Sequence, residues 1–474
     1  MLFNSSTFFI FFALVLSLYQ LPFSWRVKKV NLLWASYLFY AVWNPPFVLL
    51  LIFSTVVDWV IAKRLDCAHT TWARRGLLVT SLVVNLGLLG YFKYSNFVLA
   101  NLQALLALVG IAYQPVALNI VLPVGISFYT FQTLSYTLDI YLRKDKPWDS
   151  FLDYALYVTF FPQLVAGPIV RATDFLPQCR KAPRVTAAQL GYGFSLFTLG
   201  LFQKVVLADG LLSGVVEKVY DGGGLPGFVA AWCGTLAFAG QIYYDFSGYS
   251  NCAIGVALCL GFWLPTNFRF PYAAMGFSDF WNRWHISLSS WLRDYLYIPL
   301  GGNRNGQIRT LVNLMVTMLI GGLWHGASWT FIVWGGLHGL YLIVERLLRK
   351  VSYFPALWNH AAVKLGLGLL TFALVCITWV FFRAGALSQA LTITATLLGL
   401  GGTSPGFMLA GFDVVKSLGA ITLIVLFDIV MRNHSLEALF HARPWLVRAA
   451  MLAAMVVAIV MMPGEDRAFI YFQF

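Results

Sequence analysis

The sequence predicts an all-α, multi-pass membrane protein. Of its 474 residues, 59% are hydrophobic and 11% are charged, whereas soluble domains carry about 25% charged residues. Several apolar runs are shorter than the ~20 residues that a helix needs to cross a bilayer. We therefore expect about 11 transmembrane helices plus re-entrant and interfacial helices. The apolar runs recur over the whole length, at residues 5–21, 30–43, 46–62, 76–92, 97–113, 117–136, 190–207, 227–244, 252–264, 311–345, 365–382, 388–401, 417–431 and 447–462.

The chain is expected to form one membrane domain over residues 1–474, because no hydrophilic stretch is long enough for a separate soluble domain. The first apolar run has no basic segment before it and no small-residue cleavage site after it, which favours a first span over a cleaved signal. After Phe151, the residues Pro162, Gly167 and Pro168 break the apolar run. We expect a re-entrant element there, since broken helices at membrane depth are tolerated only inside protein or along a cavity.

The six cysteines form no Cys-x-x-Cys pair, and most of them lie in apolar segments. This pattern favours small buried hydrophobic residues over metal ligands or disulfides. The residues concerned are Cys67, Cys179, Cys233, Cys252, Cys259 and Cys376.

The net charge of +13 comes from basic clusters between the apolar runs. This distribution is the positive-inside pattern of membrane proteins and argues against a nucleic-acid partner. It places the basic loops in the cytoplasm, where they would also attract an anionic donor such as coenzyme A, although span orientation alone explains any one cluster. The clusters are Arg26/Lys28/Lys29, Lys63/Arg64/Arg74/Arg75, Arg171/Arg180/Lys181/Arg184, Arg293/Arg304/Arg309, Arg346/Arg349/Lys350 and Arg443/Arg448.

Both ends of the chain are expected on the extracytoplasmic side. The first apolar run precedes the cluster at Arg26, so the N-terminus should face outward. The last run follows Arg443 and Arg448, so residues 463–474 should also emerge outside.

The polar chemistry concentrates between about residues 240 and 345. Segment 241–251 is dense in hydroxyls around Asp245. Segment 277–297 has aromatic and leucine side chains at i, i+3/i+4 spacing, which predicts one amphipathic helix in the membrane interface, or simply a structural anchor. His285 lies on this helix, close to the basic cytoplasmic side. The side chains of the aromatic face are Trp281, Trp284, Leu288, Trp291 and Tyr295.

A second histidine, His325, lies between apolar stretches in the segment 321–327. Sixteen residues of helix from Arg309 rise about 24 Å, so His325 should lie deep in the membrane, at a different depth from His285 and much further from the cytoplasm. Residues 310–344 predict a helical pair hinged at Gly321–Gly322 and Gly326. The residues alone leave four roles open for His325: a hydrogen-bonded core histidine, a proton relay in a transporter, a metal ligand or a general acid/base. Metal ligation has the least support, because no acid and no second histidine is suitably spaced.

A set of motifs resembles the bacterial alginate O-acetyltransferase branch of the membrane-bound O-acyltransferase superfamily. Their motif core extends over about residues 117–345. The similar pieces are Leu122–Tyr129, Phe161–Pro168, Asp245–Ser250, Phe280–Ser289, Trp291–Gly302 and Gly321–Gly326.

This resemblance implies a ring of helices around a central tunnel in a bacterial inner membrane, with acyl groups passing from a cytosolic thioester, acetyl-CoA, to an acceptor on the far side. It gives His325 the position of the catalytic histidine and His285 that of a second motif residue. A thioester carbonyl is already activated, so no metal and no bound redox cofactor is required. The family often has Asp where this chain has Asn251. The matching substrate and tunnel positions are Trp281, Asn282, Trp284, Trp324, Asp245, Ser247 and Tyr249.

The tail 463–474 ends in the apolar hexapeptide 469–474, which is unusual because free termini are mostly polar. One interpretation is a packing segment or a membrane belt. The other is that the tail folds back into the outer mouth of the tunnel. Tyr471 would then accept the acyl group with His325 as base and pass it to an extracytoplasmic O-acetyltransferase partner, a role that similar tails suggest.

With this resemblance, three functions remain open. The favoured one is O-acetylation of an exported polysaccharide such as alginate. A second enzyme hypothesis is peptidoglycan O-acetylation or D-alanylation of teichoic acid. The third is a transporter or channel, which predicts paired intramembrane charges and repeat symmetry; the acidic residues Asp58, Asp139, Asp209 and Asp428 are instead scattered singly in the sequence.

Overall fold

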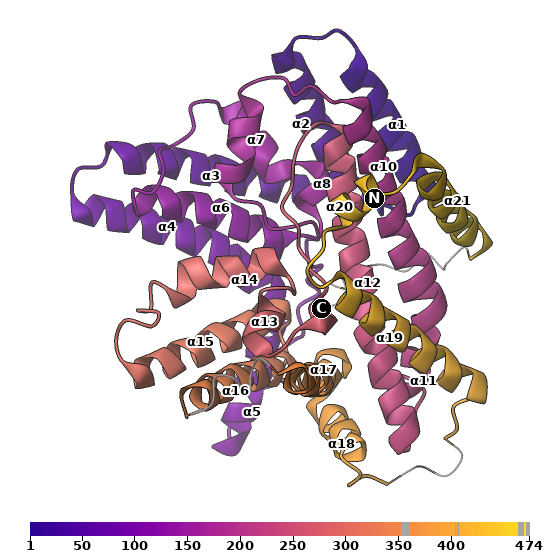
Figure 1. The fold of residues 1–474 in the computed structure, drawn as a ribbon. Coiled ribbons are helices and arrows are strands. Elements are labelled where there is room, and N and C mark those ends of the chain that lie inside the picture. Colours follow the sequence, from indigo (N-terminus) through magenta and orange to yellow (C-terminus); the bar gives the residue numbers. More distant parts are fainter. Residues whose placement is uncertain (352–359, 403, 405–406, 463–468, 471–474) are drawn as a thin grey trace. The chain divides into compact units, whose positions relative to one another are not determined.

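The computed structural model describes residues 1–351, 360–402, 404, 407–462 and 469–470. Over these residues every regular element is a helix (Figure 1). The chain divides into two compact units, residues 1–194 with 253–265 and residues 195–252 with 266–474. The expectation of a single membrane domain stays a prediction.

The first unit is built mainly from the helices before residue 194. Two helices, α10 and α12, have residues in both units. The elements are α1 (Ser6–Gln20), α2 (Trp25–Ala41), α3 (Phe47–Cys67), α4 (Thr71–Leu89), η1 (Gly90–Tyr94), α5 (Ser95–Leu108), α6 (Ile126–Tyr141), α7 (Phe151–Thr159), α8 (Phe161–Leu164), α9 (Ala172–Phe175), η2 (Leu176–Cys179) and α10 (Ala187–Leu201).

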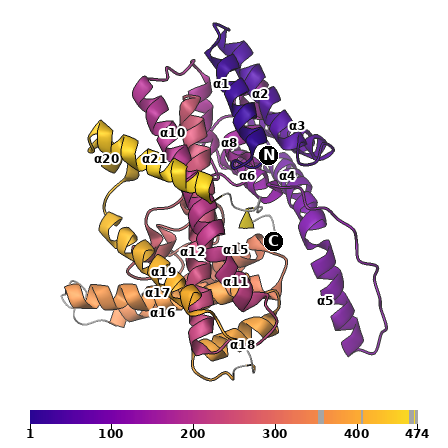
Figure 2. The ribbon, with the colours of Figure 1, turned by 90° about the vertical axis from the view of Figure 1, so that its right-hand side faces the viewer.

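Polar side chains join three helices inside this unit. The carboxylate of Asp58 on α3 is fully buried and accepts hydrogen bonds from Ser81 (2.5 Å) and Asn85 (2.8 Å) of α4 and from Thr137 (3.3 Å) of α6. The buried carboxylate is therefore satisfied by neutral donors of two neighbouring helices. In the same unit, Figure 2 shows α5 extending away from α1, α2 and α3.

The break expected after Phe151 is present. Helix α7 ends at Thr159, Phe160 adopts a non-helical conformation, and the four-residue α8 follows with Pro162 in its first turn. All residues from 153 to 170 are buried. The irregular backbone is therefore enclosed by protein, which is the condition for such a break in a membrane protein.

The second unit contains the region where the motifs concentrate. Its elements are η3 (Phe202–Leu212), α11 (Ser213–Tyr220), α12 (Phe228–Cys259), η4 (Pro271–Ala273), α13 (Phe277–Trp281), α14 (Ile286–Leu292), η5 (Arg293–Tyr297), α15 (Gln307–His325), α16 (Trp329–Val351), α17 (Ala361–Arg383), α18 (Leu387–Leu397), α19 (Gly411–Met431), α20 (Leu436–His441) and α21 (Trp445–Met461). The sequence suggested two separate runs at 227–244 and 252–264, but α12 is one continuous helix of 32 residues.

Helices α15 and α16 form an antiparallel hairpin (Figure 1). Their backbones approach closely at two glycines: a Cβ at Gly322 would lie 2.3 Å from the carbonyl oxygen of Phe331, and one at Gly335 would lie 2.3 Å from that of Met318. The expected hinge at Gly321–Gly322 is therefore wrong, because α15 runs unbroken through both residues to His325. The turn begins at Gly326, which has an extended backbone.

The segment 277–297 is not the single amphipathic helix that its aromatic spacing predicts. It forms α13, α14 and the π-helix η5, and the chain breaks before Ile286. The reason is a backbone pairing: Arg269 N–H donates to the Arg283 carbonyl, and Ile286 N–H donates to the Asn267 carbonyl. The loop before η4 thus takes the hydrogen bonds that a continuous helix would have used.

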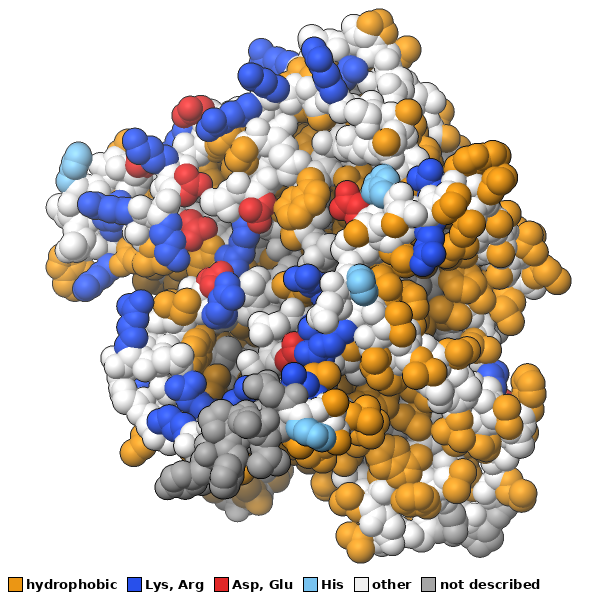
Figure 3. Space-filling model, in the orientation of Figure 1, with side chains coloured by type: hydrophobic (Ala, Val, Ile, Leu, Met, Phe, Trp, Pro, Cys, Tyr) orange, Lys and Arg blue, Asp and Glu red, His pale blue; other side chains and the backbone are white. Residues whose placement is uncertain are grey.

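Six helical stretches of the described residues are long and apolar enough to cross a membrane. They are 71–108, 187–220, 307–325, 329–350, 361–383 and 411–431. The expected total of about 11 spans stays a prediction. In the second unit, hydrophobic side chains dominate the surface over α19 and α21 in Figure 3, as lipid-facing helices require. On α21 the exposed ones include Trp445, Leu446, Val456, Val460 and Met461.

Five of the six cysteines are buried, only Cys67 is exposed, and all six are free thiols. The interpretation of the cysteines as small buried residues therefore holds for those five.

Candidate active site

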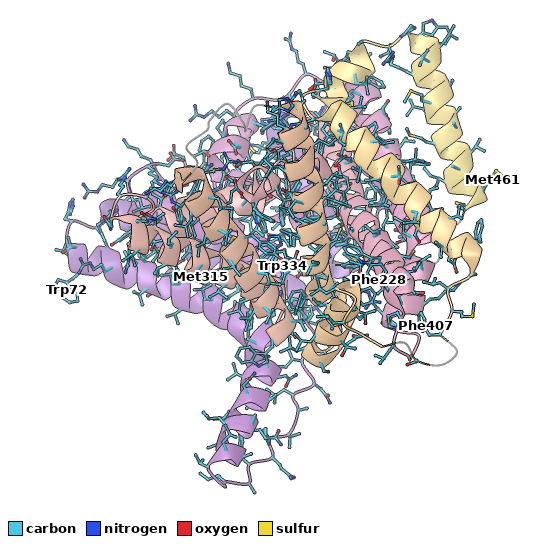
Figure 4. All side chains as sticks on the ribbon, turned by 60° about the horizontal axis from the view of Figure 1, so that its bottom comes forward. Trp72, Phe228, Met315, Trp334, Phe407 and Met461 are labelled. Carbon is cyan, nitrogen blue, oxygen red and sulfur yellow. The ribbon has the colours of Figure 1, made fainter. Side chains whose placement is uncertain are left out.

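His325 is the last residue of α15, and the α15–α16 hairpin places it at the end of a close-packed helix pair. The side chain is 3% exposed. Aromatic rings surround it: the ring centroids of Trp324 and Trp334 lie 5.0 Å from that of His325, and the ring of Phe382 lies at 5.3 Å. Figure 4 shows Trp334 in the interior, where side chains are crowded. His325 thus occupies an aromatic environment that is shielded from solvent.

His285 lies next to His325, although the sequence suggested different depths for the two residues. Their ring centroids are 6.4 Å apart. The expectation of widely different depths is wrong because His285 is not on a continuous interfacial helix. It precedes α14 with φ 42° and ψ 54°, in the left-handed region, and it is fully buried. A non-glycine residue with this backbone conformation is uncommon, and such strain clusters at functional sites.

The hydrogen bonds of Asn267 fix the proton position on His285. Asn267 Oδ1 lies 3.1 Å from His285 Nδ1 and accepts from the backbone N–H (3.3 Å) and hydroxyl (3.0 Å) of Ser287. Because a backbone N–H can only donate, this Asn267 atom is the oxygen, and His285 Nδ1 must carry a hydrogen to reach it. The neutral ring then has its lone pair on Nε2.

Burial also determines the charge of His285. It lowers the pKa of this imidazole to about 3, because a low-dielectric environment disfavours the charged form. His285 is therefore neutral near pH 7. A neutral imidazole with its lone pair on Nε2 is able to accept a proton or a hydrogen bond there.

Asp245 belongs to a buried ion cluster. Lys204 Nζ contacts Asp245 Oδ1 and lies 3.0 Å from Asp209 Oδ1, and the backbone N–H of Ile470 donates to Asp245 Oδ2 at 2.7 Å. The three charged residues are at most 8% exposed. The π-helix η3 makes this possible, since its i→i+5 pattern places Lys204 and Asp209 on one face. Asp209 is therefore not the isolated acid that its sequence surroundings suggested.

The other aromatic residues expected along the tunnel pack near the two histidines. The Trp324 ring lies 6.0 Å from that of His285, and the Trp281 ring lies 5.8 Å from that of Trp334. Trp284 is fully buried against Trp379, with ring centroids 4.9 Å apart. These side chains form part of the core around the histidine pair.

Ser247 and Tyr249 follow Asp245 on α12, and both are buried. The Tyr249 ring packs on that of Phe469 at 5.0 Å. Asn282 does not share this environment, because it is exposed at the C-terminal end of α13. Tyr471 lies outside the described residues.

Motif reasoning missed several residues that shape the site. Asn267 lies 18 positions before His285 in a loop without a local pattern, and Lys204 lies in an apolar stretch far from Asp245 in sequence. A third histidine, His338 of α16, is fully buried and lies with Nε2 3.0 Å from the Thr378 hydroxyl. The only signal in the sequence that could have found these residues is a polar residue inside or next to an apolar run.

Over the described residues, no group of three or more His, Cys, Asp or Glu side chains is arranged to hold a metal ion.

Comparisons with known proteins bear on this cluster. The model of the MBOAT, membrane-bound O-acyltransferase family, matches residues 5–383, which include both histidines. The probable alginate O-acetylase of Pseudomonas aeruginosa is 42% identical over 393 residues, which cover 82% of this chain and 73% of that protein. The peptidoglycan O-acetyltransferase of Helicobacter pylori is 38% identical over 402 residues, 79% of this chain and 75% of that protein. The teichoic acid D-alanyltransferase of Streptococcus thermophilus is 30% identical over 243 residues, 48% of this chain and 57% of that protein.

Proposed function

The chain belongs to the membrane-bound O-acyltransferase family, and we propose that this acyltransferase passes an acetyl group from acetyl-CoA across the membrane for the O-acetylation of an exported polysaccharide such as alginate. The observation that carries the proposal is the buried histidine pair, with 6.4 Å between the ring centroids of His285 and His325. The similarity to an alginate O-acetylase over 82% of the chain supports the choice of polymer.

In the proposed reaction, His325 acts as the general base. It removes the proton of the acceptor hydroxyl while that oxygen attacks the thioester carbonyl. The new C–O bond forms, the C–S bond breaks, and the departing thiolate takes the proton back from the imidazolium. One ester and one free thiol result, and His325 returns to its neutral form. A positioned base of this kind contributes about 10²–10⁴-fold to the rate.

The aromatic surroundings of His325 suit this chemistry. Trp324, Trp334 and Phe382 leave little space for water at the imidazole. Excluding water protects the thioester from hydrolysis and strengthens electrostatic interactions in the site. We assign His285, neutral and oriented by Asn267, to hydrogen bonding of the reacting groups through Nε2.

The sidedness of the reaction is part of the proposal. The basic loops would face the cytoplasm of a bacterial cell and attract the negatively charged acetyl-CoA, while the N-terminus and residues 463–474 would lie outside. An extracytoplasmic O-acetyltransferase would then carry the acetyl group to the polymer. No cofactor is held between turnovers in this scheme.

We further propose that Tyr471 relays the acetyl group. Its neighbour in the chain, Ile470, hydrogen-bonds to Asp245 through its backbone N–H, and Phe469 packs on α12. Both residues belong to the unit that holds the histidine pair. The Tyr471 phenol would attack the thioester first, and the resulting aryl ester would transfer its acetyl group outside.

The second candidate differs in its acceptor. The relatives named peptidoglycan O-acetyltransferase and teichoic acid D-alanyltransferase favour acetylation of peptidoglycan or export of D-alanine to teichoic acid. The buried Lys204–Asp245 pair is the kind of charge pairing that a transporter would also have. Family membership nevertheless makes the chain an enzyme.

The substitution His325→Ala tests the mechanism. We expect acetyl transfer from radiolabelled acetyl-CoA in membranes to fall at least about 100-fold, because the base is lost. The matched control is His434→Ala, which removes an exposed histidine of the same unit. Normal transfer by His325→Ala at equal membrane levels would exclude a base role.

The substitution Tyr471→Phe tests the relay, since it removes only the phenol oxygen. We expect transfer to the polymer to stop and a covalently acetylated protein, detected by mass spectrometry after a pulse of donor, to disappear. Phe472→Tyr, which adds a phenol one position away, serves as the control for the tail. Full activity of Tyr471→Phe would eliminate the relay and leave the sugar as direct acceptor.

A further inference from the structure

Two buried carboxylates of the second unit contact the same lysine. Lys204 forms ion pairs with Asp209 and with Asp245. A buried carboxylate is costly unless donors satisfy both of its oxygens. Lys204 serves one oxygen of Asp245, and the second oxygen takes the backbone N–H of Ile470 at 2.7 Å.

The segment Phe469–Ile470 is bound by more than this hydrogen bond. Phe469 is 1% exposed, and its ring lies 5.0 Å from that of Tyr249 and 5.5 Å from that of Phe246. All of these partners come from α12. Helix α12 therefore contacts this segment in two ways. The Asp245 carboxylate binds the backbone N–H of Ile470, and two aromatic rings pack on the Phe469 side chain.

We propose that Lys204, Asp209 and Asp245 form a charged clamp that holds the main chain of the segment Phe469–Ile470 against α12. A hydrogen bond to a carboxylate is stronger than one to a neutral acceptor. Since the donor is a backbone N–H, the clamp fixes the path of the chain whatever side chain stands at position 470. Asp209 completes the clamp by holding Lys204 from the π-helix η3.

The clamp also positions the segment relative to the catalytic histidines. The Phe246 ring contacts both Phe469, at 5.5 Å, and His285, at 4.6 Å between ring centroids. This step rests on the proposed function, in which Tyr471, the residue after Ile470, accepts the acetyl group. Lys204, Asp209 and Asp245 are thus positioning residues.

Hydrogen–deuterium exchange of the full chain in lipid nanodiscs tests the clamp without relying on the reaction. In Asp245→Asn, the Ile470 amide should exchange at least about 10-fold faster, because the acceptor is neutral and its one oxygen is also needed by Lys204. The matched control is Asp428→Asn, another buried carboxylate, which accepts the Tyr272 backbone N–H at 2.9 Å. That variant should accelerate exchange at Tyr272 and leave Ile470 protected. Continued protection of α15 and α16 in both variants verifies the fold.

Two outcomes would overturn the clamp: unchanged protection of Ile470 in Asp245→Asn, or equal acceleration at Ile470 in both variants.

The positioning role of the clamp is tested by kinetics. Asp245→Asn and Ile470→Pro, which lacks the N–H, should each lower kcat about 10-fold or more without changing KM for acetyl-CoA. Unchanged kcat with a loosened Ile470 would overturn the positioning role. If His325→Ala retains transfer, the proposed function fails, but the exchange result on the clamp still stands.

Discussion

The single hydrogen bond between Asn267 and His285 determines which ring nitrogen of this histidine carries the hydrogen. Asn267 Oδ1 accepts from His285 Nδ1, and Ser287 holds the same oxygen in place. The imidazole is thereby kept in one tautomer, with its lone pair on Nε2. The left-handed backbone at His285 is the conformational cost of this orientation.

Asn267→Asp should change the pH dependence of transfer. A carboxylate at the position that now lies 3.1 Å from Nδ1 would raise the pKa of His285 above its present value of about 3, because a nearby negative charge favours the protonated ring. A protonated ring has no lone pair on Nε2. The acid limb of the pH–rate profile should therefore move to higher pH, by about one unit or more.

The measurement is a pH–rate profile in purified membranes. Asn251→Asp is the control, since Asn251 hydrogen-bonds to Gln203 on a neighbouring helical stretch. An unshifted acid limb in Asn267→Asp, with normal folding, would show that the neutral form of His285 is not needed.

The sequence predicted residues of the site to different extents. His325, His285 and Asp245 stand out through their motifs, and the structure places all three in one unit. Their partners Asn267 and Lys204 do not stand out, because pairing across 18 and 41 positions leaves no periodic pattern in the sequence. Short motifs indicate the candidate residues of the site, whereas tertiary contacts decide what orients them.

At the scale of elements, helix content was predicted well and helix continuity was not. Apolar runs predict helices. The segment 277–297 shows, however, that apolar side chains at i, i+3/i+4 spacing do not always form one continuous helix. The break at His285 depends on hydrogen bonds to the loop around Asn267, which no local propensity encodes. The reverse error occurred at Gly321–Gly322, where glycines suggest a hinge but serve helix packing.

Gly322→Ala should destabilise the α15–α16 hairpin, because the added Cβ would lie 2.3 Å from the Phe331 carbonyl oxygen. Overpacking of this kind costs about 1–3 kcal/mol. Gly336→Ala is the control on α16, where the nearest atom would lie at an ordinary 3.6 Å and alanine favours the helix.

Thermal unfolding in detergent, followed by tryptophan fluorescence, checks this expectation. The Tm should fall for Gly322→Ala and stay equal or rise for Gly336→Ala. Equal Tm values in the two variants would contradict a close helix contact at Gly322.

For the whole molecule, composition was sufficient to predict a multi-pass membrane protein, because 59% hydrophobic residues cannot be covered by a soluble fold of this length. The number of spans was harder to predict. Six stretches of the described residues meet the length and apolarity criteria. Helix α12 is long enough, with 32 residues, but the polar side chains around Asp245 lower its apolarity, and it does not meet them. Polar residues of the candidate site thus lower the mean hydropathy by which a membrane span is recognised.

The orientation of the chain gives a prediction at this scale. In a Cys67→Ser background, a cysteine at Ser5 or Asp466 should react with a membrane-impermeant maleimide on intact spheroplasts, because both ends are expected outside. A cysteine at Arg75 should react only after permeabilisation. The opposite labelling pattern would reverse the proposed direction of acetyl transfer.

The π-helix η3 has a consequence for how this site is inherited. Lys204 and Asp209 share a face only because five residues separate them in an i→i+5 winding; on an α-helix the same interval turns the two side chains about 140° apart. Insertion of a single codon between them would leave both residue types in the gene and still part the pair, because an interval of six residues turns the two side chains about 120° apart on an α-helix. In descendants of this gene, the ion cluster therefore depends on the number of residues between lysine and aspartate as well as on their identities.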